Sequence, residues 1–147
     1  MAKYWLSTIS LQNFEIDRAN DFYIAGFEER HLKKVIQVEA GDRFAYYVKG
    51  KGFGLVCTIL DRCYLSWKPI WQGGIFPCRF ERHCELVMPS GKFLHPRSIL
   101  SQLSFVPPYL KSGNRWGLAF HSNLRLITES DFQVIEDEMR RLAPRCV

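Results

Sequence analysis

The segment from residue 43 to residue 60 places the strongest constraint on the fold. Two runs rich in β-branched and aromatic residues, Arg43–Val48 and Phe53–Leu60, flank the tetrapeptide Lys-Gly-Lys-Gly at residues 49–52. Such runs favour strands, and a short connection containing glycine lets two of them pair as a hairpin. A turn signal, Ala-Gly-Asp at residues 40–42, precedes the first run. An antiparallel sheet is therefore expected in the core.

Shorter elements are predicted before this hairpin. Tyr4–Ile9 is predicted to be an opening strand, and Leu11–Asn20 a short helix. The aromatic segment Phe22–Phe27 lacks a clear period and is expected to be a loop or a short strand. Between Glu28 and Val38, apolar residues recur at helical spacing, which predicts a helix.

Further strands and helices are predicted in the second half of the chain. A strand is expected over Phe76–Val87, and a helix entry at His95, which is followed by proline. Thr128, with Asp131 three residues later, resembles a capping box at the start of a helix with an apolar stripe. These elements indicate an α+β fold with a curled, mostly antiparallel sheet, in which strands adjacent in sequence pair as hairpins.

Length and hydropathy indicate one domain over residues 1–147. The first residues lack the apolar run of a signal peptide, and no stretch of about 18 apolar residues occurs. We therefore expect a cytoplasmic protein without a membrane partner.

The five cysteines are an odd number without a tight pairing pattern, which favours reduced thiols. A zinc site is the more specific alternative to reduced thiols, because Cys78 lies near His83 and Cys84 in the sequence. Neither a CxxC pair nor a second pair of ligands accompanies them. No metal and no cofactor are therefore expected.

Positive charge is concentrated in the middle of the chain. Residues 43–125 contain twelve Lys or Arg residues against three acidic residues, whereas residues 129–138 contain five acidic residues and no basic one. A basic region favours polyanion partners through phosphate neutralisation, although a solvated surface explains the same charge equally well.

The sequence offers little for catalysis. It contains no GxSxG elbow, P-loop, Rossmann glycine pattern or HExxH helix. The aromatic residues are more informative, because Trp67, Trp71 and Trp116 lie in loops rich in basic residues and glycine. A base that stacks on such a ring gains about 1–3 kcal/mol, while Lys and Arg hold the phosphates. The alternative is that these tryptophans only cap the core.

Several short motifs together resemble the EVE domain, a PUA-like domain related to the YTH readers of N6-methyladenine. In chain order they are Ala25-Gly-Phe-Glu-Glu-Arg-His31, Gly41-Asp42, Tyr46-Tyr-Val48, Phe53-Gly54, Pro69-Ile-Trp71, Phe76-Pro-Cys-Arg-Phe80, Trp116-Gly-Leu-Ala-Phe120 and Ile127-Thr-Glu-Ser-Asp-Phe132. The resemblance covers the chain from Tyr4 to about Met139. It implies a PUA-like, curled, mostly antiparallel β-barrel flanked by short helices, and a partner that is DNA or RNA carrying a modified base.

The resemblance also implies where a ligand binds. The pocket would lie where Tyr23–Phe27 meets the Trp71 loop and the Trp116 segment, with Asn13 at its edge. The pocket residues are expected to be Asn13, Tyr23, Ala25, Gly26, Phe27, Trp71, Trp116 and Phe120. Many relatives carry a tryptophan at the position of Ala25, so one wall of an aromatic cage is missing here unless Tyr23 or Phe27 supplies it.

Three functions are compatible with these residues. The first is a non-catalytic reader of a modified base, in which Trp71 and Trp116 stack on the base and phosphate is contacted by Arg30, Lys33, Arg79 and Arg115. The second is an enzyme acting on a nucleotide or small molecule, with His31 or His121 as acid or base. The third is a small-molecule sensor or interaction module that shares the fold.

Overall fold

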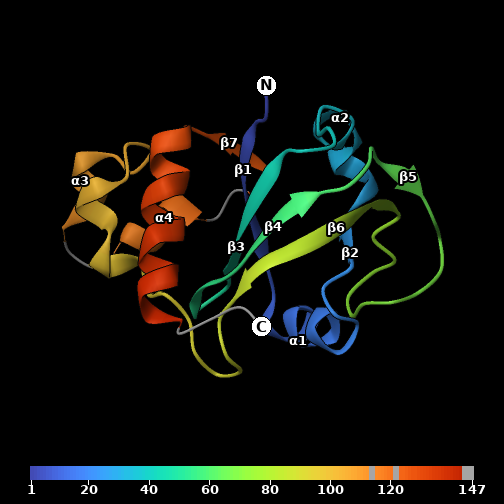
Figure 1. The fold of residues 1–147 in the computed structure, drawn as a ribbon, viewed down its shortest axis with the longest axis horizontal. Helices are drawn as coiled ribbons and strands as arrows, with labels where there is room; N and C mark the ends of the chain where they lie inside the picture. Colours follow the sequence, from blue (N-terminus) through green and yellow to red (C-terminus); the bar gives the residue numbers. More distant parts are fainter. Residues whose placement is uncertain (113–114, 121–122, 144–147) are drawn as a thin grey trace.

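The fold is known from a computed structural model that describes residues 1–112, 115–120 and 123–143. Within these ranges, seven strands form a curled sheet surrounded by short helices (Figure 1). The strands are β1 (Tyr4–Ile9), β2 (Ile24–Phe27), β3 (Arg43–Val48), β4 (Gly52–Ile59), β5 (Tyr64–Leu65), β6 (Cys78–Val87) and β7 (Arg125–Ile127). The α-helices are α1 (Leu11–Ala19), α2 (Leu32–Val35), α3 (Pro108–Lys111) and α4 (Glu129–Leu142), and the 3-10 helices are η1 (Glu29–His31), η2 (Pro96–Ser98), η3 (Leu100–Gln102) and η4 (Trp116–Phe120).

The predicted hairpin is confirmed at the centre of the sheet. β3 and β4 pair antiparallel, from Arg43 opposite Thr58 to Val48 opposite Gly52. Side chains along β3 alternate between two apolar cores: Phe44 and Tyr46 belong to one, whereas Ala45 and Tyr47 belong to the other. This strand is therefore buried on both faces, and its hydrophobic residues form a continuous run.

The strands follow the order β2-β6-β4-β3-β1-β7, and β5 pairs with β6. The sheet is mostly antiparallel, as expected, but β1 and β3 run parallel from Tyr4 opposite Arg43 to Ile9 opposite Val48. The general expectation that strands adjacent in sequence pair does not hold for β1 and β2, because β2 pairs with β6. A parallel pair needs a long crossover, and the segment containing α1, β2 and α2 supplies it.

The helix predicted between Glu28 and Val38 is wrong in length. The structure contains only the turn η1 followed by the single-turn helix α2. After α2 the chain turns inward, where Val38 is buried and the Asp42 carboxylate accepts a hydrogen bond from the Glu39 N–H at 3.0 Å. The same carboxylate accepts from the Trp5 indole at 3.1 Å, so contacts with β1 override the helical pattern.

The helix start at Thr128 is confirmed, although only half of the capping box forms. The Thr128 hydroxyl accepts a hydrogen bond from the Asp131 N–H at 3.1 Å. The Asp131 carboxylate instead accepts from the Ser104 N–H and hydroxyl, at 2.8 and 2.5 Å. Asp131 thus ties α4 to the segment that follows η3.

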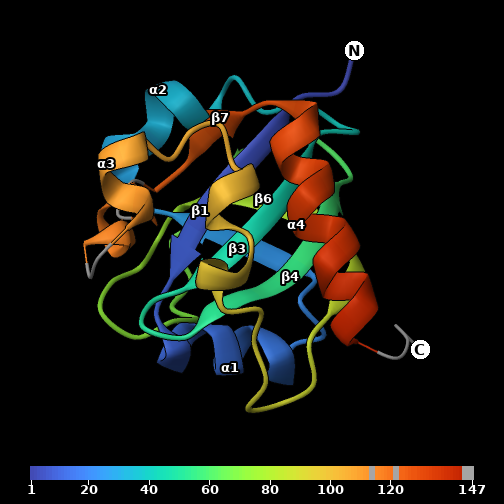
Figure 2. The ribbon, with the colours of Figure 1, turned by 90° about the vertical axis from the view of Figure 1, so that its left-hand side faces the viewer.

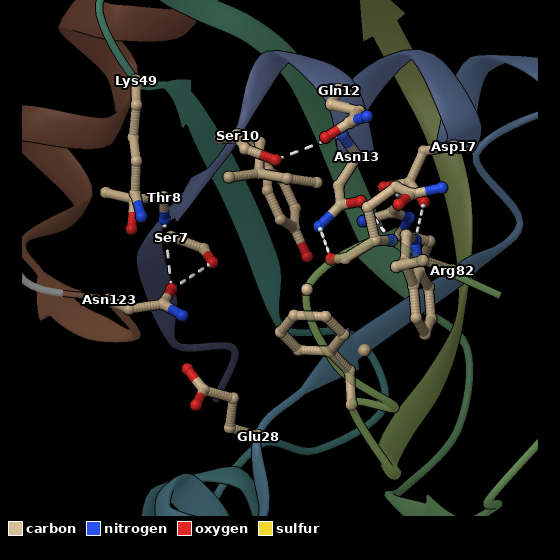
Figure 3. A pocket seen from close by; sticks show the side chains of 17 residues that line it. Ser7, Thr8, Ser10, Gln12, Asn13, Asp17, Glu28, Lys49, Arg82 and Asn123 are labelled. Atoms are coloured by element: carbon tan, nitrogen blue, oxygen red, sulfur yellow. Dashed lines mark hydrogen bonds and ion pairs between the residues drawn. The ribbon is translucent and has the colours of Figure 1, made fainter. Parts of the chain in front are cut away.

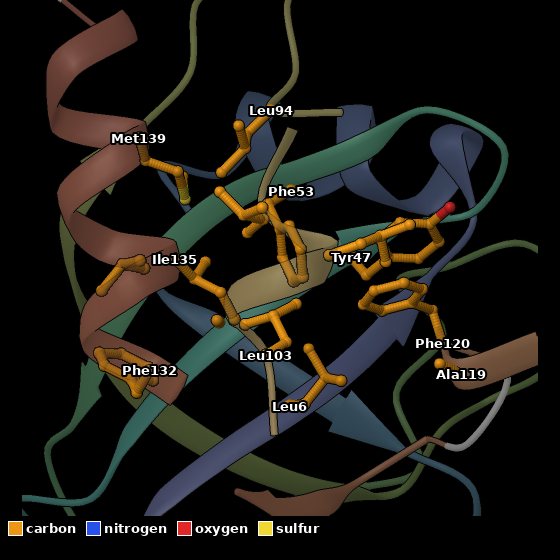
Figure 4. Close-up of a cluster of buried hydrophobic side chains, with 14 of the residues drawn as sticks. Leu6, Tyr47, Phe53, Leu94, Leu103, Ala119, Phe120, Phe132, Ile135 and Met139 are labelled. Carbon is orange, nitrogen blue, oxygen red and sulfur yellow. The ribbon is translucent and has the colours of Figure 1, made fainter. Parts of the chain in front are cut away.

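The two cores lie on opposite faces of the central strands. Helix α4 covers one face, with Phe132, Ile135 and Met139 pointing towards Phe53 and Leu103 (Figures 2 and 4). On the other face, α1 and β2 pack against β3 and β6 around Phe14, Phe44 and Phe80. The candidate site lies beside this second core.

None of the helices in the described ranges is long and apolar enough to cross a membrane. Cys57, Cys63 and Cys78 are free thiols, and burial raises the pKa of Cys57 to about 12. Cys146 lies outside the described residues.

Candidate ligand-binding site

A polar cavity of about 350 Å³ opens beside α1 (Figure 3). Its walls come from the end of β1, the first turns of α1, strand β2 and the loop between β5 and β6, and Tyr46 of β3 and Arg82 of β6 contribute from the sheet. The lining residues are Ser7, Thr8, Ile9, Ser10, Gln12, Asn13, Asp17, Gly26, Glu28, Tyr46, Lys49, Trp71, Gln72, Gly73, Phe76, Arg82 and Asn123.

Asn13 holds the long loop against α1. Its amide group donates from Nδ2 to the Gln72 carbonyl oxygen at 3.0 Å and accepts at Oδ1 from the Gln72 N–H at 2.9 Å. The position of Asn13 is set by the start of the helix, where Ser10 caps α1 and accepts from the Asn13 N–H. The loop is thereby fixed to a helix rather than left to its own conformation.

Trp71 forms an aromatic wall next to this clamp. Its indole Nε1 donates to Asp17 Oδ1 at 2.6 Å, and its ring meets Phe76 edge-to-face with centroids 5.9 Å apart. β2 approaches the ring so closely that a Cβ on Gly26 would lie 2.4 Å from Trp71 Cζ3. Glycine at this position therefore makes room for the tryptophan.

A buried ion pair lies behind Trp71. Arg82 Nη2 donates to Asp17 Oδ2 at 2.8 Å and Arg82 Nε donates to the Phe22 carbonyl oxygen at 2.6 Å. Burial raises the pKa of Asp17, and the adjacent Arg82 opposes this shift. Burial alone lowers the pKa of Arg82, but Tyr46 and Asp17 outweigh it and raise that pKa, so the guanidinium stays charged.

Two buried polar atoms in this cluster have no hydrogen-bond partner among the described residues. They are Nη1 of Arg82 and the hydroxyl of Tyr46. The guanidinium carbon of Arg82 lies 4.9 Å from the centre of the Tyr46 ring, so both atoms belong to one stacked pair. A buried polar atom left without a partner costs about 1–3 kcal/mol. Both residues line the cavity, so the two atoms without partners belong to its wall.

The wall formed by the end of β1 is also polar. Asn123 Oδ1 accepts from the Ser7 hydroxyl at 2.7 Å and from the Thr8 N–H at 3.1 Å. Lys49 and Glu28 complete this side of the cavity, as Figure 3 shows. The acidic residues that line the cavity, Asp17 and Glu28, balance the basic residues Lys49 and Arg82.

The architecture is shared with solved structures, although neither a protein-family model nor a curated protein sequence matches the chain. PSPTO5229 from Pseudomonas syringae superposes with a TM-score of 0.62 at 12% identity, covering 92% of this chain and 99% of that one. The Mmi1 YTH domain gives 0.66 at 7% identity, covering 96% of this chain and 76% of that one. The YTH domain of Zygosaccharomyces rouxii MRB1, in complex with N6-methyladenosine RNA, gives 0.64 at 13% identity, covering 95% of this chain and 90% of that one.

This chain has a PUA-like, YTH-related fold. The fold that the EVE-domain resemblance implied is thus confirmed, with the sheet curled into a half-barrel. At these identities the likeness establishes the fold alone.

Within the YTH-related fold, only part of the predicted pocket comes together. Asn13, Gly26 and Trp71 line the cavity. Ala25 and Phe27 alternate with Gly26 along β2 and point into the core, where each is 2% exposed. Phe27 therefore does not replace the missing cage tryptophan. Tyr23 does not replace it either, because its side chain is exposed and lies outside the cavity lining.

The Trp116 segment belongs to a different place, so this part of the prediction is wrong. Trp116 packs edge-to-face on His95, with ring centroids 5.0 Å apart. Phe120 stacks on Tyr47 in the α4-side core, with centroids 4.9 Å apart. A second cavity of about 520 Å³ lies here, lined by Tyr47, Lys49, Gly50, Gly117 and Phe120. Trp71 lines the cavity beside α1, whereas Trp116 packs against the α4-side core and does not line that cavity.

The four residues predicted to contact phosphate lie in two different environments. Arg30, Lys33 and Arg115 are exposed, and Arg30 forms an ion pair with Glu28 at 3.2 Å. The prediction for Arg79 is wrong, because its side chain is buried and its guanidinium donates to the chain itself. It bonds the Ser66 hydroxyl and the carbonyl oxygens of Lys68, Ile75 and Phe76. Arg79 organises the loop that carries Trp71.

Of the two histidines proposed for catalysis, the structure describes only His31, and it does not line the cavity. His31 lies in η1, outside the lining, and burial together with Arg30 lowers its pKa. His121 lies outside the described residues. In the described ranges, no group of three or more His, Cys, Asp or Glu residues is arranged to hold a metal ion.

Sequence reasoning missed the polar interior of the site. Tyr46, Asp17 and Arg82 come from three separate elements, and no local pattern connects them. Lys49 carried a weak signal, since it lies in the turn of the predicted hairpin among basic residues.

Proposed function

We propose that this chain is a non-catalytic binding module that recognises one modified base of DNA or RNA in the cavity beside Trp71. The observation that carries the proposal is the fixed aromatic corner of Trp71 and Phe76 inside a polar cavity. A base stacked on one ring meets the other ring edge-on, so one planar group is held in one orientation. The cavity volume lies at the lower end of the usual range for small-ligand sites, about 300–1,000 Å³.

Basic residues near the cavity also support the proposal, because they could contact the phosphate groups of a nucleic acid. Lys49 lines the cavity and is exposed, and Arg30 and Lys33 lie in the segment that follows β2. Phosphate groups flanking an inserted base would meet these side chains, and each such contact makes affinity fall as salt rises. The YTH domain bound to N6-methyladenosine RNA supports this ligand class for the fold. A cytoplasmic location is part of the same proposal.

Binding of oligonucleotides tests the proposal. Single- and double-stranded DNA and RNA, each unmodified or carrying one methylated or hydroxymethylated base, are titrated by fluorescence anisotropy at two salt concentrations. We expect one modified oligonucleotide to bind at least about tenfold tighter than its unmodified form, equal to about 1.4 kcal/mol. We also expect this affinity to fall with salt.

Two tryptophans of the same loop provide a matched pair of variants. Trp71→Ala removes the cavity wall and is expected to abolish the preference for the modified base, whereas Trp67→Ala, at a site 57% exposed, is expected to keep it. Circular dichroism establishes that both variants are folded. Absence of salt-dependent binding to every oligonucleotide would overturn the proposal and favour a free nucleoside or other small molecule in the same cavity.

A further inference from the structure

The inference rests on the proposed function and concerns which edge of a base the cavity accepts. It starts from the two unpartnered atoms, Arg82 Nη1 and the Tyr46 hydroxyl. Arg82 cannot turn away from the cavity wall, because Nε and Nη2 are already bound to Phe22 and Asp17. The direction of its remaining N–H groups is therefore set by the fold.

Both atoms act as hydrogen-bond donors. A guanidinium nitrogen donates and cannot accept. The hydroxyl of Tyr46 keeps its proton, because burial raises its pKa well above the usual value. The guanidinium carbon of Arg82 lies 4.9 Å from the centre of the Tyr46 ring and both residues line the cavity, so the two donors can serve one ligand with two neighbouring acceptors.

The charge of the site favours a neutral ligand at this depth. Asp17 neutralises Arg82 directly, so the deep part of the cavity carries no net charge, whereas Lys49 is exposed. A phosphate group would bring two to three acceptors but also negative charge next to the buried Asp17 carboxylate. The planar Trp71 and Phe76 walls suit a ring better than a tetrahedral group.

We propose that the cavity binds a modified base through an edge with two adjacent acceptors, with Tyr46 Oη and Arg82 Nη1 as the donors. Cytosine offers such a pair in O2 and N3, and guanine in O6 and N7. Adenine does not, because each of its edges places an amino donor or a C–H group next to a ring-nitrogen acceptor. The site therefore selects modified cytosine or guanine over N6-methyladenine.

The base preference is tested with one oligonucleotide sequence whose central base is 5-methylcytosine, N2-methylguanine or N6-methyladenine. We expect one of the first two to bind at least about tenfold tighter than the third. Tightest binding of the N6-methyladenine oligonucleotide would overturn this inference and leave the proposed function standing. Failure of all three to bind in a salt-dependent manner would overturn both.

Tyr46→Phe tests the donor directly, because it removes one unpartnered oxygen and keeps the ring under Arg82. The variant is expected to be at least as resistant to urea as the parent protein, yet to bind the preferred oligonucleotide about five- to tenfold more weakly. Tyr47→Phe, the next residue on the opposite face of β3, is the matched control and is expected to leave affinity unchanged. Unchanged affinity in Tyr46→Phe would overturn the inference.

A base analogue closes the test. Replacing the acceptor ring nitrogen of the preferred base by C–H, as in 3-deazacytosine or 7-deazaguanine, is expected to weaken binding to the parent protein. If the nitrogen and the hydroxyl bond each other, the analogue and Tyr46→Phe together cost less than the product of their separate effects. Independent effects would show that Tyr46 does not contact that nitrogen.

Discussion

At Gly26 the backbone of β2 passes against the ring of Trp71, and the fit leaves no space for a side chain. The neighbouring positions, Ala25 and Phe27, face the core, so only this residue of the strand faces the cavity. Because Gly26 carries a hydrogen atom where other residues carry Cβ, the Trp71 ring can lie against β2 and form the aromatic wall of the cavity. Contacts of this kind decide ligand geometry without contributing a polar group.

Gly26→Ala is expected to lower the free energy of unfolding by about 1–3 kcal/mol, because overpacking forces Trp71 or the Phe76 backbone to move. Urea unfolding followed by tryptophan fluorescence measures the loss. Gly117→Ala is the control, since a Cβ there meets no atom within 4 Å. Equal stability of the two variants would contradict the close approach seen at Gly26.

At the scale of elements, the site depends on how a helix start and a loop are joined. Asn13 lies in the first turn of α1 and binds both backbone groups of Gln72. Arg79 of β6 binds the other part of the same loop through three of its carbonyl oxygens. The loop that carries Trp71 is therefore held from two sides by side chains of regular elements.

Asn13→Ala is expected to release the middle of this loop while leaving the core intact. The Gln72 amide loses its acceptor, so its hydrogen exchange should accelerate, and oligonucleotide affinity should fall. Asn20→Ala is the control, because Asn20 caps the other end of α1 and bonds only the Ile16 carbonyl through its side chain. Unchanged exchange at Gln72 in Asn13→Ala would show that the clamp does not hold the loop.

Thr128→Ala is expected to destabilise the protein by about 1 kcal/mol through loss of the α4 cap. Thermal or urea unfolding measures the effect. Ser130→Ala, at an exposed position in the first turn of the helix, should change stability far less. A similar loss in both variants would mean that helix propensity, rather than the hydroxyl of Thr128, is responsible.

At the scale of the whole molecule, α4 is joined to the sheet by an ion-pair network as well as by its apolar stripe. Arg43 of β3 donates to Glu136 of α4 at 2.6 Å and to Glu85 of β6 at 3.0 Å. Arg140 donates to Glu136 from the next turn of the helix at 2.8 Å. The network spans three elements and fixes the helix over the strands that carry the core.

The network makes stability depend on pH. Burial by itself raises the pKa of Glu136, but the bonds from Arg43 and Arg140 outweigh it, so the pKa lies below its ordinary value of 4.5. A depressed pKa means that this contribution is complete above about pH 4.5 and is lost as pH falls through the lower folded value. Acid therefore weakens the attachment of α4.

Glu136→Gln is expected to cost about 1.5–3 kcal/mol at pH 7, as for other hydrogen bonds to charged groups. The difference in unfolding free energy between the parent protein and this variant should shrink as pH falls below 4.5. Glu138→Gln, which removes an ion pair on the exposed side of α4, should have a much smaller effect. A difference that does not vary with pH would exclude Glu136 as the titrating group.

Several features were predictable from the sequence because they depend on neighbouring residues. The β3–β4 hairpin follows from two apolar runs around Lys-Gly-Lys-Gly, the α4 start from Thr128, and the aromatic wall from the loop of Trp71. The helix over residues 28–38 was not predictable in this way, because the buried Asp42 and contacts with β1 end it early.

Local pattern by itself determined the α+β class, the central hairpin and the apolar faces, since hydrophobic periodicity is a property of short segments. Only the tertiary structure decided that β1 runs parallel to β3, that Trp116 lies away from Trp71, and that Arg82 meets Asp17 across 65 residues of chain. A buried polar site forms where distant elements cross, and its energy depends on desolvation and pairing. Neither quantity exists until the chain has folded.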